Sequence, residues 1–323
     1  MSPATGAAGV TLVAIALYAV FGGADFGGGV WDLLASGPRA RQQRATITHA
    51  IGPVWEAHHV WLIFALVTLF TCFPPAYADI AAQLNAPLTL ALLGIVLRGA
   101  AFVFRNFGED VPALAQGWTV VFGAASIIAP FFLGDAVGAI AAGDYAWTSP
   151  FALSVGLFAV ALCAQVAAVF LVRETREGAL QDDFRRRAVA ATLAVWVLGA
   201  LPTVLAWRTV PQLISALHDP AAQVAVVLAF VFGLVVLALV VTGSDLAARI
   251  AVGAEVVAVL GGWFGGQAPA VVPGRWTLAT AAAPDATLTA YLIAAAIGSV
   301  LLIPAMLLLY TVFKGPGADL GGS

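Results

Sequence analysis

Long apolar runs separated by short polar connectors fill the chain from end to end. Nine of these runs reach the roughly 20 residues that a helix needs to cross the roughly 30 Å hydrocarbon layer of a bilayer. We therefore expect an all-α integral membrane protein with about nine transmembrane helices, grouped as two four-helix bundles plus one extra helix. The predicted spans lie at about 9–33, 49–72, 80–104, 117–140, 150–172, 187–207, 221–242, 246–267 and 288–313.

The connectors are too short to form a separate soluble domain. Residues 1–314 are predicted to form one polytopic membrane domain, and residues 315–323 a short cytoplasmic tail. Composition agrees, because 62% of the residues are hydrophobic and only 10% are charged, against about 25% charged in an ordinary soluble domain. The first apolar run has no Lys or Arg before it, so it lacks the basic start of a secretory signal and is predicted to be a retained span.

Basic residues fall on alternate connectors. One side of the predicted membrane holds all but two of the 14 Lys and Arg residues. Because cytoplasmic loops carry an excess of Lys and Arg, this alternation predicts an N-terminus outside the cell and a C-terminus in the cytoplasm. The basic residues on the predicted cytoplasmic side are Arg39, Arg41, Arg44, Arg98, Arg105, Arg173, Arg176, Arg185, Arg186, Arg187, Arg249 and Lys314, and those on the other side are Arg208 and Arg275.

Several classes of function are disfavoured by what the chain lacks. The two cysteines, Cys72 and Cys163, lie inside apolar runs and form no C-x-x-C pair, so neither a disulfide framework nor a thiolate metal site is indicated. The motif for covalent haem attachment, C-x-x-C-H, is absent from the sequence as well. A net charge of −3, spread along the chain, gives no indication of nucleic-acid binding.

The first span ends in a glycine-rich stretch that contains an acid, "GGADFGGGVWDLLA". Asp25 lies about eight residues before the end of the span, which places it roughly 12 Å inside the membrane. A carboxylate at that depth costs about 2.5 to 3.5 kcal/mol, so we expect it to face protein or water rather than lipid. Small residues four positions apart would let another helix approach closely and enclose it. These pairs are Gly23 with Gly27 and Ala24 with Gly28.

The second predicted span contains a second ionisable group in "AIGPVWEAHHVWLI". Glu56 lies about 10 Å deep from the same side, at a depth matching the first acid. His59 follows Glu56 at i+3 on the same helix face, and His58 follows Trp55 in the same way. Pro53 removes one backbone hydrogen bond and is expected to kink the helix just below Glu56. The second span is thus predicted to contribute a polar face to the cytoplasmic half.

The third span reaches the same level and brings Arg98 close as a counter-charge. We interpret Asp25, Glu56, His59 and Arg98 as a cluster that exchanges protons with the cytoplasm, since His is suited to relay near neutral pH. The alternative is a static network of salt bridges that ties the first three spans together. A di-metal site is disfavoured because only one E-x-x-H motif is present. His58 is included in the predicted proton pathway, and the two histidines are interpreted as packed or hydrogen-bonded rather than as haem ligands.

These motifs resemble subunit II of the cytochrome bd-type quinol oxidases. The resemblance rests on "GGADFGGGVWDLLA", "AIGPVWEAHHVWLI", "FPPAYA" and "LRGAAFVFR", and it continues more loosely as far as "FLVRET". Beyond that point only the number and spacing of the spans agree. The first two motifs are long and specific, so they carry the identification.

The resemblance implies a multi-pass subunit of the bacterial cytoplasmic membrane, paired with a homologous subunit I. In that family subunit I carries haem b and haem d, oxidises quinol and reduces oxygen to water. Subunit II has no haem ligands and supplies part of a cytoplasmic proton route, which includes the positions of Glu56 and Asp25. The resemblance also allows small single-helix subunits and a quinone bound in this chain, and it includes Trp55 in the motif as a packing residue with no chemical role derived.

One position departs from the family pattern. Members usually have an acid where this chain has Val103, and valine cannot relay a proton. The proton entrance is therefore predicted to run by Asp32 or Asp110, unless the route is vestigial. A further deep acid, Glu255, lies about ten residues into the eighth span, where helix packing and contact with a partner subunit are both left open.

The leading hypothesis is thus a non-catalytic subunit of a terminal quinol oxidase that delivers protons to the haem-bearing subunit. The first alternative is a proton-coupled secondary transporter, which is disfavoured because internal repeats and broken helices around a midplane site are not evident. The second alternative is a purely structural partner that shields subunit I from lipid.

Overall fold

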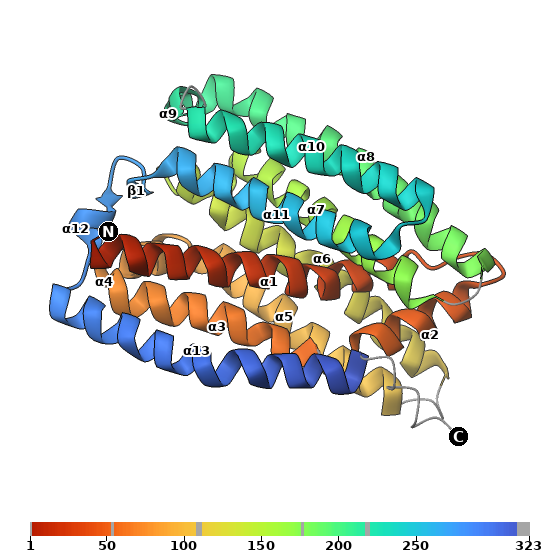
Figure 1. Ribbon diagram of the computed structural model, residues 1–323. Helices are drawn as coiled ribbons and strands as arrows, with labels where there is room; N and C mark the ends of the chain where they lie inside the picture. The colour runs from red at the N-terminus through yellow and green to blue at the C-terminus, as the bar shows by residue number, and fades with distance from the viewer. Residues whose placement is uncertain (1, 53–54, 108–111, 176–177, 217–219, 315–323) are drawn as a thin grey trace.

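The computed structural model describes residues 2–52, 55–107, 112–175, 178–216 and 220–314, and Figure 1 draws the whole chain. The side chains of Trp55 and Glu56 are outside the described part. The elements in chain order are α1 (Pro3–Leu33), α2 (Ala40–Ile51), α3 (Trp55–Cys72), α4 (Pro74–Gln83), α5 (Asn85–Phe107), α6 (Pro112–Ala142), α7 (Pro150–Glu174), α8 (Gly178–Thr209), α9 (Pro211–Ala216), α10 (Pro220–Thr242), α11 (Asp245–Gln267), β1 (Ala270–Val272), β2 (Trp276–Thr277), α12 (Leu278–Ala281) and α13 (Asp285–Lys314).

The prediction of an all-helical membrane protein is confirmed. Within the described residues, eight helices are long and apolar enough to cross a bilayer, and α3 with α4 forms a bent pair that makes a ninth. The long helices lie side by side along one direction (Figure 1). The strands β1 and β2 form a small antiparallel hairpin between α11 and α12. The grouping into two bundles and the orientation in the membrane stay predictions.

Two short helices were not expected from the hydropathy pattern. The second span was predicted to start at residue 49, but residues 49–51 complete α2, a separate helix that buries Gln43, Ile47 and Ile51 along one face. This i, i+4, i+8 spacing is typical of an amphipathic helix lying across the end of a bundle. The prediction was wrong here because α2 is too polar and too short to form part of a span.

The third span was predicted to start at residue 80, but the structure ends α4 at Gln83 and starts α5 at Asn85. Proline occupies the first turn of α4, where no intrahelical N–H bond is lost, and a proline cannot continue the preceding helix. The chain therefore bends by 118° between α3 and α4. Hydropathy merged α4 with the following span because α4 is itself apolar.

Serine caps begin two of the central helices. The Ser2 side chain accepts a hydrogen bond from the Thr5 amide at the start of α1, and the Ser149 side chain accepts one from the Ala152 amide at the start of α7. In both helices proline follows at the first helical position, where its fixed φ suits the helix. These caps fix the first turn of the two helices that meet at the candidate site.

Helix α1 lies at the centre of the fold. It packs against α3, α6 and α7, while α5 pairs with α6, α7 with α8, and α10 with α11. Helix α13 contacts α1 and α3 and runs along the outside of the molecule (Figure 1). The most apolar 18-residue window of α13 contains no fully buried residue, although Leu288 near its start is fully buried, so α13 is less enclosed than the central helices.

A hydrogen-bonded group, which we call the Asp79 clasp, closes the end of the molecule that holds the N-terminus. The Asp79 carboxylate on α4 accepts a hydrogen bond from the Tyr145 hydroxyl at 2.8 Å and one from the Trp276 indole N–H at 2.9 Å. The Arg275 guanidinium lies 4.7 Å from the centre of the Tyr145 ring. The clasp thus joins α4 to the connection between α6 and α7 and to the hairpin.

The opposite end, which we call the basic end, holds α2 and the connections from α7 to α8 and from α10 to α11 (Figure 1). Ion pairs join these segments. Arg39 binds Asp183 through two hydrogen bonds of 2.7 and 2.8 Å, and Arg249 lies 2.6 Å from Glu174. The basic connectors therefore gather at one end, as the predicted topology requires.

Candidate functional site

A buried carboxylate–imidazole pair joins α1 to α3. Asp25 Oδ2 lies 2.5 Å from His58 Nδ1, and each residue keeps only 4% of its surface exposed. The His58 ring also stacks on Phe21, with ring centres 5.5 Å apart. A carboxylate and an imidazole at this distance share one hydrogen bond, so the pair has the geometry to hold or pass a proton.

Arg98 of α5 completes this group, which we call the Asp25 cluster: Asp25, His58 and Arg98. The Arg98 side chain is 1% exposed and donates a hydrogen bond from Nη2 to the backbone carbonyl of Asp25 at 3.0 Å. Its guanidinium lies 5.4 Å from the Phe26 ring centre and 5.1 Å from the Phe122 ring centre. Arg98 therefore reaches Asp25 through the main chain and holds a positive charge beside the acid.

Glycines on α1 allow the helices around the cluster to approach closely. A Cβ at Gly27 would lie 1.9 Å from the Cys163 carbonyl oxygen of α7, and one at Gly23 would lie 3.5 Å from the Cys163 sulfur. The Trp31 indole donates a hydrogen bond to the Ala164 carbonyl at 2.7 Å on the same face. Gly27 thus lets α1 and α7 meet at backbone distance, and this contact encloses the acid on its α7 side.

A second buried acid lies two turns along α1, nearer the basic end. Asp32 is fully buried, and its carboxylate accepts a hydrogen bond from Arg105 Nη1 at 3.2 Å. Arg105 also donates to the Thr48 hydroxyl of α2 at 2.6 Å, and Arg44 donates to the Asp32 carbonyl at 3.3 Å. We call Asp32 and Arg105 the Asp32 pair. It lies apart from the Asp25 cluster, and α2 contributes directly to it.

The Phe122 ring of α6 lies between these two groups. The Arg105 guanidinium is 4.3 Å from its centre and that of Arg98 is 5.1 Å from it. Arg98 and Arg105 are seven residues apart on α5, as Asp25 and Asp32 are on α1, so the two groups lie two helical turns apart along the bundle. The arrangement is a polar layer near the basic end, an aromatic ring, and a deeper polar layer.

The remaining sequence-predicted residues are placed as follows. His59 points to the neighbouring aromatic side chains, with its ring 5.9 Å from Tyr18 and 6.3 Å from Phe26, so His58 rather than His59 binds the acid of α1. The side chains of Glu56 and Trp55, and the whole of Pro53 and Asp110, lie outside the described residues. Their part in the site therefore stays a prediction.

Three polar contributors to the protein interior were missed by the sequence reasoning. Thr48 and Arg105 belong to the Asp32 pair or bind it, as described above. Asp135 on α6 is fully buried, and neither of its carboxylate oxygens has a hydrogen-bond partner among the described residues. The sequence did contain a signal for Asp135, because an acid inside an apolar span is costly wherever it occurs.

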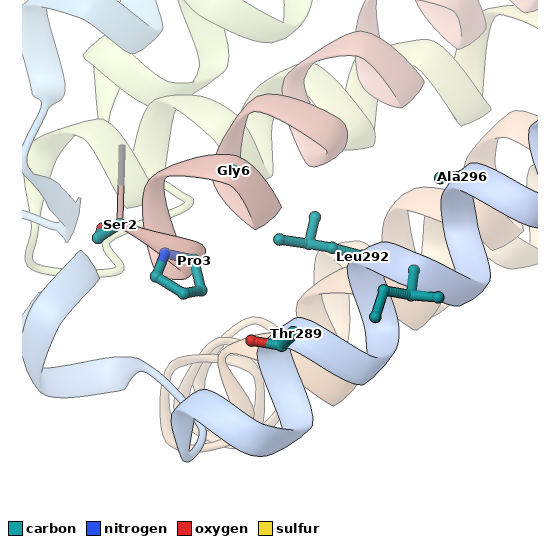
Figure 2. Close-up of a pocket in the computed structure, with 7 residues that line it drawn as sticks. Ser2, Pro3, Gly6, Thr289, Leu292 and Ala296 are labelled. Atoms are coloured by element: carbon teal, nitrogen blue, oxygen red, sulfur yellow. The ribbon is translucent and has the colours of Figure 1, made fainter.

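No group of three or more His, Cys, Asp or Glu side chains that could hold a metal ion lies within the searched, described residues. A groove of about 430 Å³ does open between the first turns of α1 and α13, lined by Ser2, Gly6 and Thr289 among others. Figure 2 shows Leu292 reaching from α13 toward Gly6 of α1. This groove is at the opposite end of the molecule from the basic end and shares no residue with the Asp25 cluster.

Comparison with known proteins supports one family. The family model described as cytochrome bd terminal oxidase subunit II matches residues 4–313. Cytochrome bd ubiquinol oxidase subunit 2 of Bacillus subtilis is 30% identical over 159 residues, which cover 45% of this chain and 46% of that protein. Cytochrome bd-I ubiquinol oxidase subunit 2 of Escherichia coli is 27% identical over 204 residues, which cover 58% of this chain and 52% of that protein. The matched stretches thus span about half the length of these relatives.

A solved structure extends the likeness to the fold of the whole chain. A chain of the bd oxidase from Geobacillus thermodenitrificans has a TM-score of 0.83 and 21% sequence identity, and the match covers 97% of this chain and 99% of that chain. The family model spans nearly the same residues as this structural match. The chain therefore belongs to the cytochrome bd terminal oxidase subunit II family.

Proposed function

We propose that this chain is the non-haem subunit of a bd-type quinol oxidase, bound in the membrane to a homologous haem-bearing subunit I. Quinol is the substrate of the complex, oxygen is reduced to water in subunit I, and haem b and haem d belong to that subunit. The proposal rests on the family match over residues 4–313 and on the names of the relatives, which are ubiquinol oxidase subunits.

The proposed contribution of this chain is to carry protons from the cytoplasm toward subunit I. The observation that carries this proposal is the 2.5 Å contact between Asp25 Oδ2 and His58 Nδ1, with both side chains closed to solvent. An imidazole has a second ring nitrogen, so it can accept a proton on one side and release one on the other. Arg98 positions the acid by holding its backbone carbonyl.

The Asp32 pair is the proposed entrance. It lies nearer the basic end and reaches the amphipathic helix α2 through Thr48. Val103, where family members usually carry an acid, is 42% exposed, so it lies on the outer face of α5. The missing acid therefore does not interrupt the line from Asp32 to Asp25 along α1, and Asp32 serves in its place.

Purification of the complex tests the proposed identity. The chain is expected to copurify with a homologous subunit whose absorption spectrum contains haem d. Transport of a solute by this chain alone in vesicles, with no haem-bearing partner, would favour a secondary transporter instead. Copurification with full haem content but no dependence of oxygen reduction on Asp25 or His58 would leave only a structural role.

An isosteric variant tests the proton role. Asp25→Asn keeps the shape of the side chain but removes the ionisable carboxyl, and we expect it to lower the rate of oxygen reduction by at least about tenfold, since positioned proton-transfer groups contribute about 10²- to 10⁴-fold. The haem spectrum of the purified complex should be unchanged. Asp182→Asn is the matched control, because the Asp182 side chain is 62% exposed at the basic end. Equal turnover in the two variants would contradict the proposal.

A further inference from the structure

A further buried acid lies on α11 and contacts residues of α7 and α10 (Figure 1 shows these helices). Glu255 of α11 is 2% exposed, and Gln165 of α7 and Thr192 of α8 are fully buried. The Gln165 amide nitrogen donates to Glu255 Oε2 at 2.9 Å and to the Thr192 hydroxyl at 3.2 Å. Three helices therefore meet in one polar group, which we call the Glu255 node: Glu255, Gln165 and Thr192.

Helix α10 packs closely against the node at a glycine. A Cβ at Gly233 would lie 2.9 Å from Glu255 Oε1 and 2.7 Å from the indole nitrogen of Trp196 on α8. Both polar atoms therefore lie beside the part of α10 that has no side chain. The bare backbone leaves the second carboxyl oxygen and the indole N–H facing one common position.

The hydrogen-bond roles inside the node are fixed by its chemistry. The Thr192 hydroxyl donates to the Ala188 carbonyl at 2.9 Å, so toward Gln165 it accepts. The Gln165 amide nitrogen donates to both of its partners, which leaves Gln165 Oε1 as an acceptor. Gln165 Oε1 and Trp196 Nε1 are both buried and have no hydrogen-bond partner among the described residues. The node thus lacks a donor for Gln165 and an acceptor for Trp196.

No described contact compensates a negative charge on Glu255. The residues around it from α7, α8 and α10 are the neutral Gln165, Thr192, Trp196 and Gly233, and on the α1 side the apolar Val20 lies 4.0 Å from the position of a Cβ at Gly253. Arg249 lies six residues earlier on α11, about 9 Å along the axis. Its guanidinium is bonded to Glu174 and to the Phe170 carbonyl, each at 2.6 Å.

We propose that Glu255 is a proton-binding site, held as the neutral carboxylic acid beside Gln165 and Trp196. An ionised carboxylate would offer only acceptors to a node that already has an unpaired acceptor. The neutral acid adds one O–H donor for Gln165 Oε1 and keeps acceptor capacity for the Trp196 indole, whereas the ionised carboxylate leaves Gln165 Oε1 without a donor. The bound species is a proton, and the Glu255 node shares no residue with the Asp25 cluster.

Infrared spectroscopy of the purified complex tests this inference, because protonated and ionised carboxyl groups absorb in separate regions. The wild-type complex is expected to show a carboxylic acid C=O band that is lost in Glu255→Gln and shifts in D₂O. Glu174→Gln is the control, since that carboxylate pairs with Arg249 and its loss should reduce carboxylate absorption only. Loss of carboxylate absorption in Glu255→Gln, with the acid region unchanged, would overturn the proposal.

Two further variants keep the test decisive if Glu255→Gln does not assemble. Gln165→Leu removes the amide donor and should shift the acid band of Glu255 without abolishing it. Gly233→Ala would place a Cβ 2.9 Å from Glu255 Oε1 and should also shift the band. An acid band that is identical in both variants and the wild type would show that the band does not arise from Glu255, and the proposal would fail.

Discussion

At the scale of single residues, the acid on α1 is tolerated inside the membrane because neighbours from three helices surround it. A carboxylate in that position costs about 2.5 to 3.5 kcal/mol when it stands alone. Here His58 binds the carboxylate, Arg98 binds the carbonyl of the same residue, and Gly27 brings α7 into contact. The glycines are therefore as necessary to the site as the ionisable groups.

Gly27→Ala should separate α1 from α7. The added Cβ would meet the Cys163 carbonyl oxygen at 1.9 Å, and backbone cannot yield as a flexible side chain can. Overpacking of this kind costs about 1 to 3 kcal/mol or more, so we expect a clearly lower midpoint of thermal unfolding for the purified complex. The measurement is differential scanning calorimetry in detergent.

Gly9→Ala on the same helix is the control for this substitution. A Cβ at Gly9 would meet nothing within 4 Å, and alanine favours a helix over glycine by roughly 0.8 to 1.0 kcal/mol. The Gly9 variant should be as stable as the wild type or slightly more stable. If Gly27→Ala behaved like Gly9→Ala, the close approach of α1 and α7 would not be needed.

At the scale of elements, the short helices α2 and α4 give the two ends of the bundle their structure. Helix α4 turns away from α3 at Pro74 and is held by the Asp79 clasp, while α2 lies across the basic end and supplies Thr48 to the Asp32 pair. Within the described residues, α2 is not among the helices long and apolar enough to span a bilayer, and α4 meets that test only together with α3. Each nevertheless fixes polar groups that the long helices alone would leave without partners.

The clasp is expected to weaken at alkaline pH. Burial, and next the hydrogen bond to Asp79, raise the pKa of the Tyr145 phenol above its ordinary value. A raised pKa means that the folded state favours the neutral phenol, so its stabilisation is complete below the unfolded pKa of about 10 and is lost as pH rises through the folded value. The free energy of unfolding, measured by chemical denaturation, should therefore fall as the pH rises above about 10.

Tyr145→Phe should lower stability by about 1 kcal/mol near neutral pH, because one buried hydrogen bond is lost, and should remove this part of the alkaline decline. Tyr77→Phe, on α4 but outside the clasp, is the control and should keep the wild-type pH profile. An unchanged alkaline decline in Tyr145→Phe would show that the clasp is not its source.

At the scale of the whole molecule, the basic connectors gather at one end, which agrees with the orientation predicted from the positive-inside rule. Two exposed positions test it. Asp182→Cys lies at the basic end and Asp144→Cys in the connection between α6 and α7 at the other end. A membrane-impermeant thiol reagent should label only Asp144→Cys in whole cells and only Asp182→Cys in inverted vesicles.

The native cysteines make this labelling interpretable, because Cys72 is fully buried and Cys163 lies within a membrane span, in contact with α1. Wild-type protein should therefore give little signal from either side. The opposite labelling pattern would reverse the orientation. It would also place the Asp32 pair on the outer side and remove the cytoplasmic entrance from the account.

The number and type of the long elements could be predicted from the sequence because a membrane span needs little beyond length and apolarity. The rotation of each helix could not. His58 and His59 are neighbours on a helix whose faces are nearly all apolar, and both contact α1, so periodicity alone does not tell which of them reaches Asp25. The Glu255 node was equally inaccessible, since its partners come from helices 90 residues apart in sequence.

The central claim is that Asp25 and His58 act together in proton delivery, and a double-mutant cycle on oxygen reduction tests it most directly. The purified complex is compared as wild type, Asp25→Asn, His58→Gln and the double variant, with haem content measured in each. Groups that work as one unit give grossly non-additive losses, so the double variant should lose about as much turnover as either single variant. Losses that multiply, or turnover that stays at the wild-type rate in all three variants, would contradict the account.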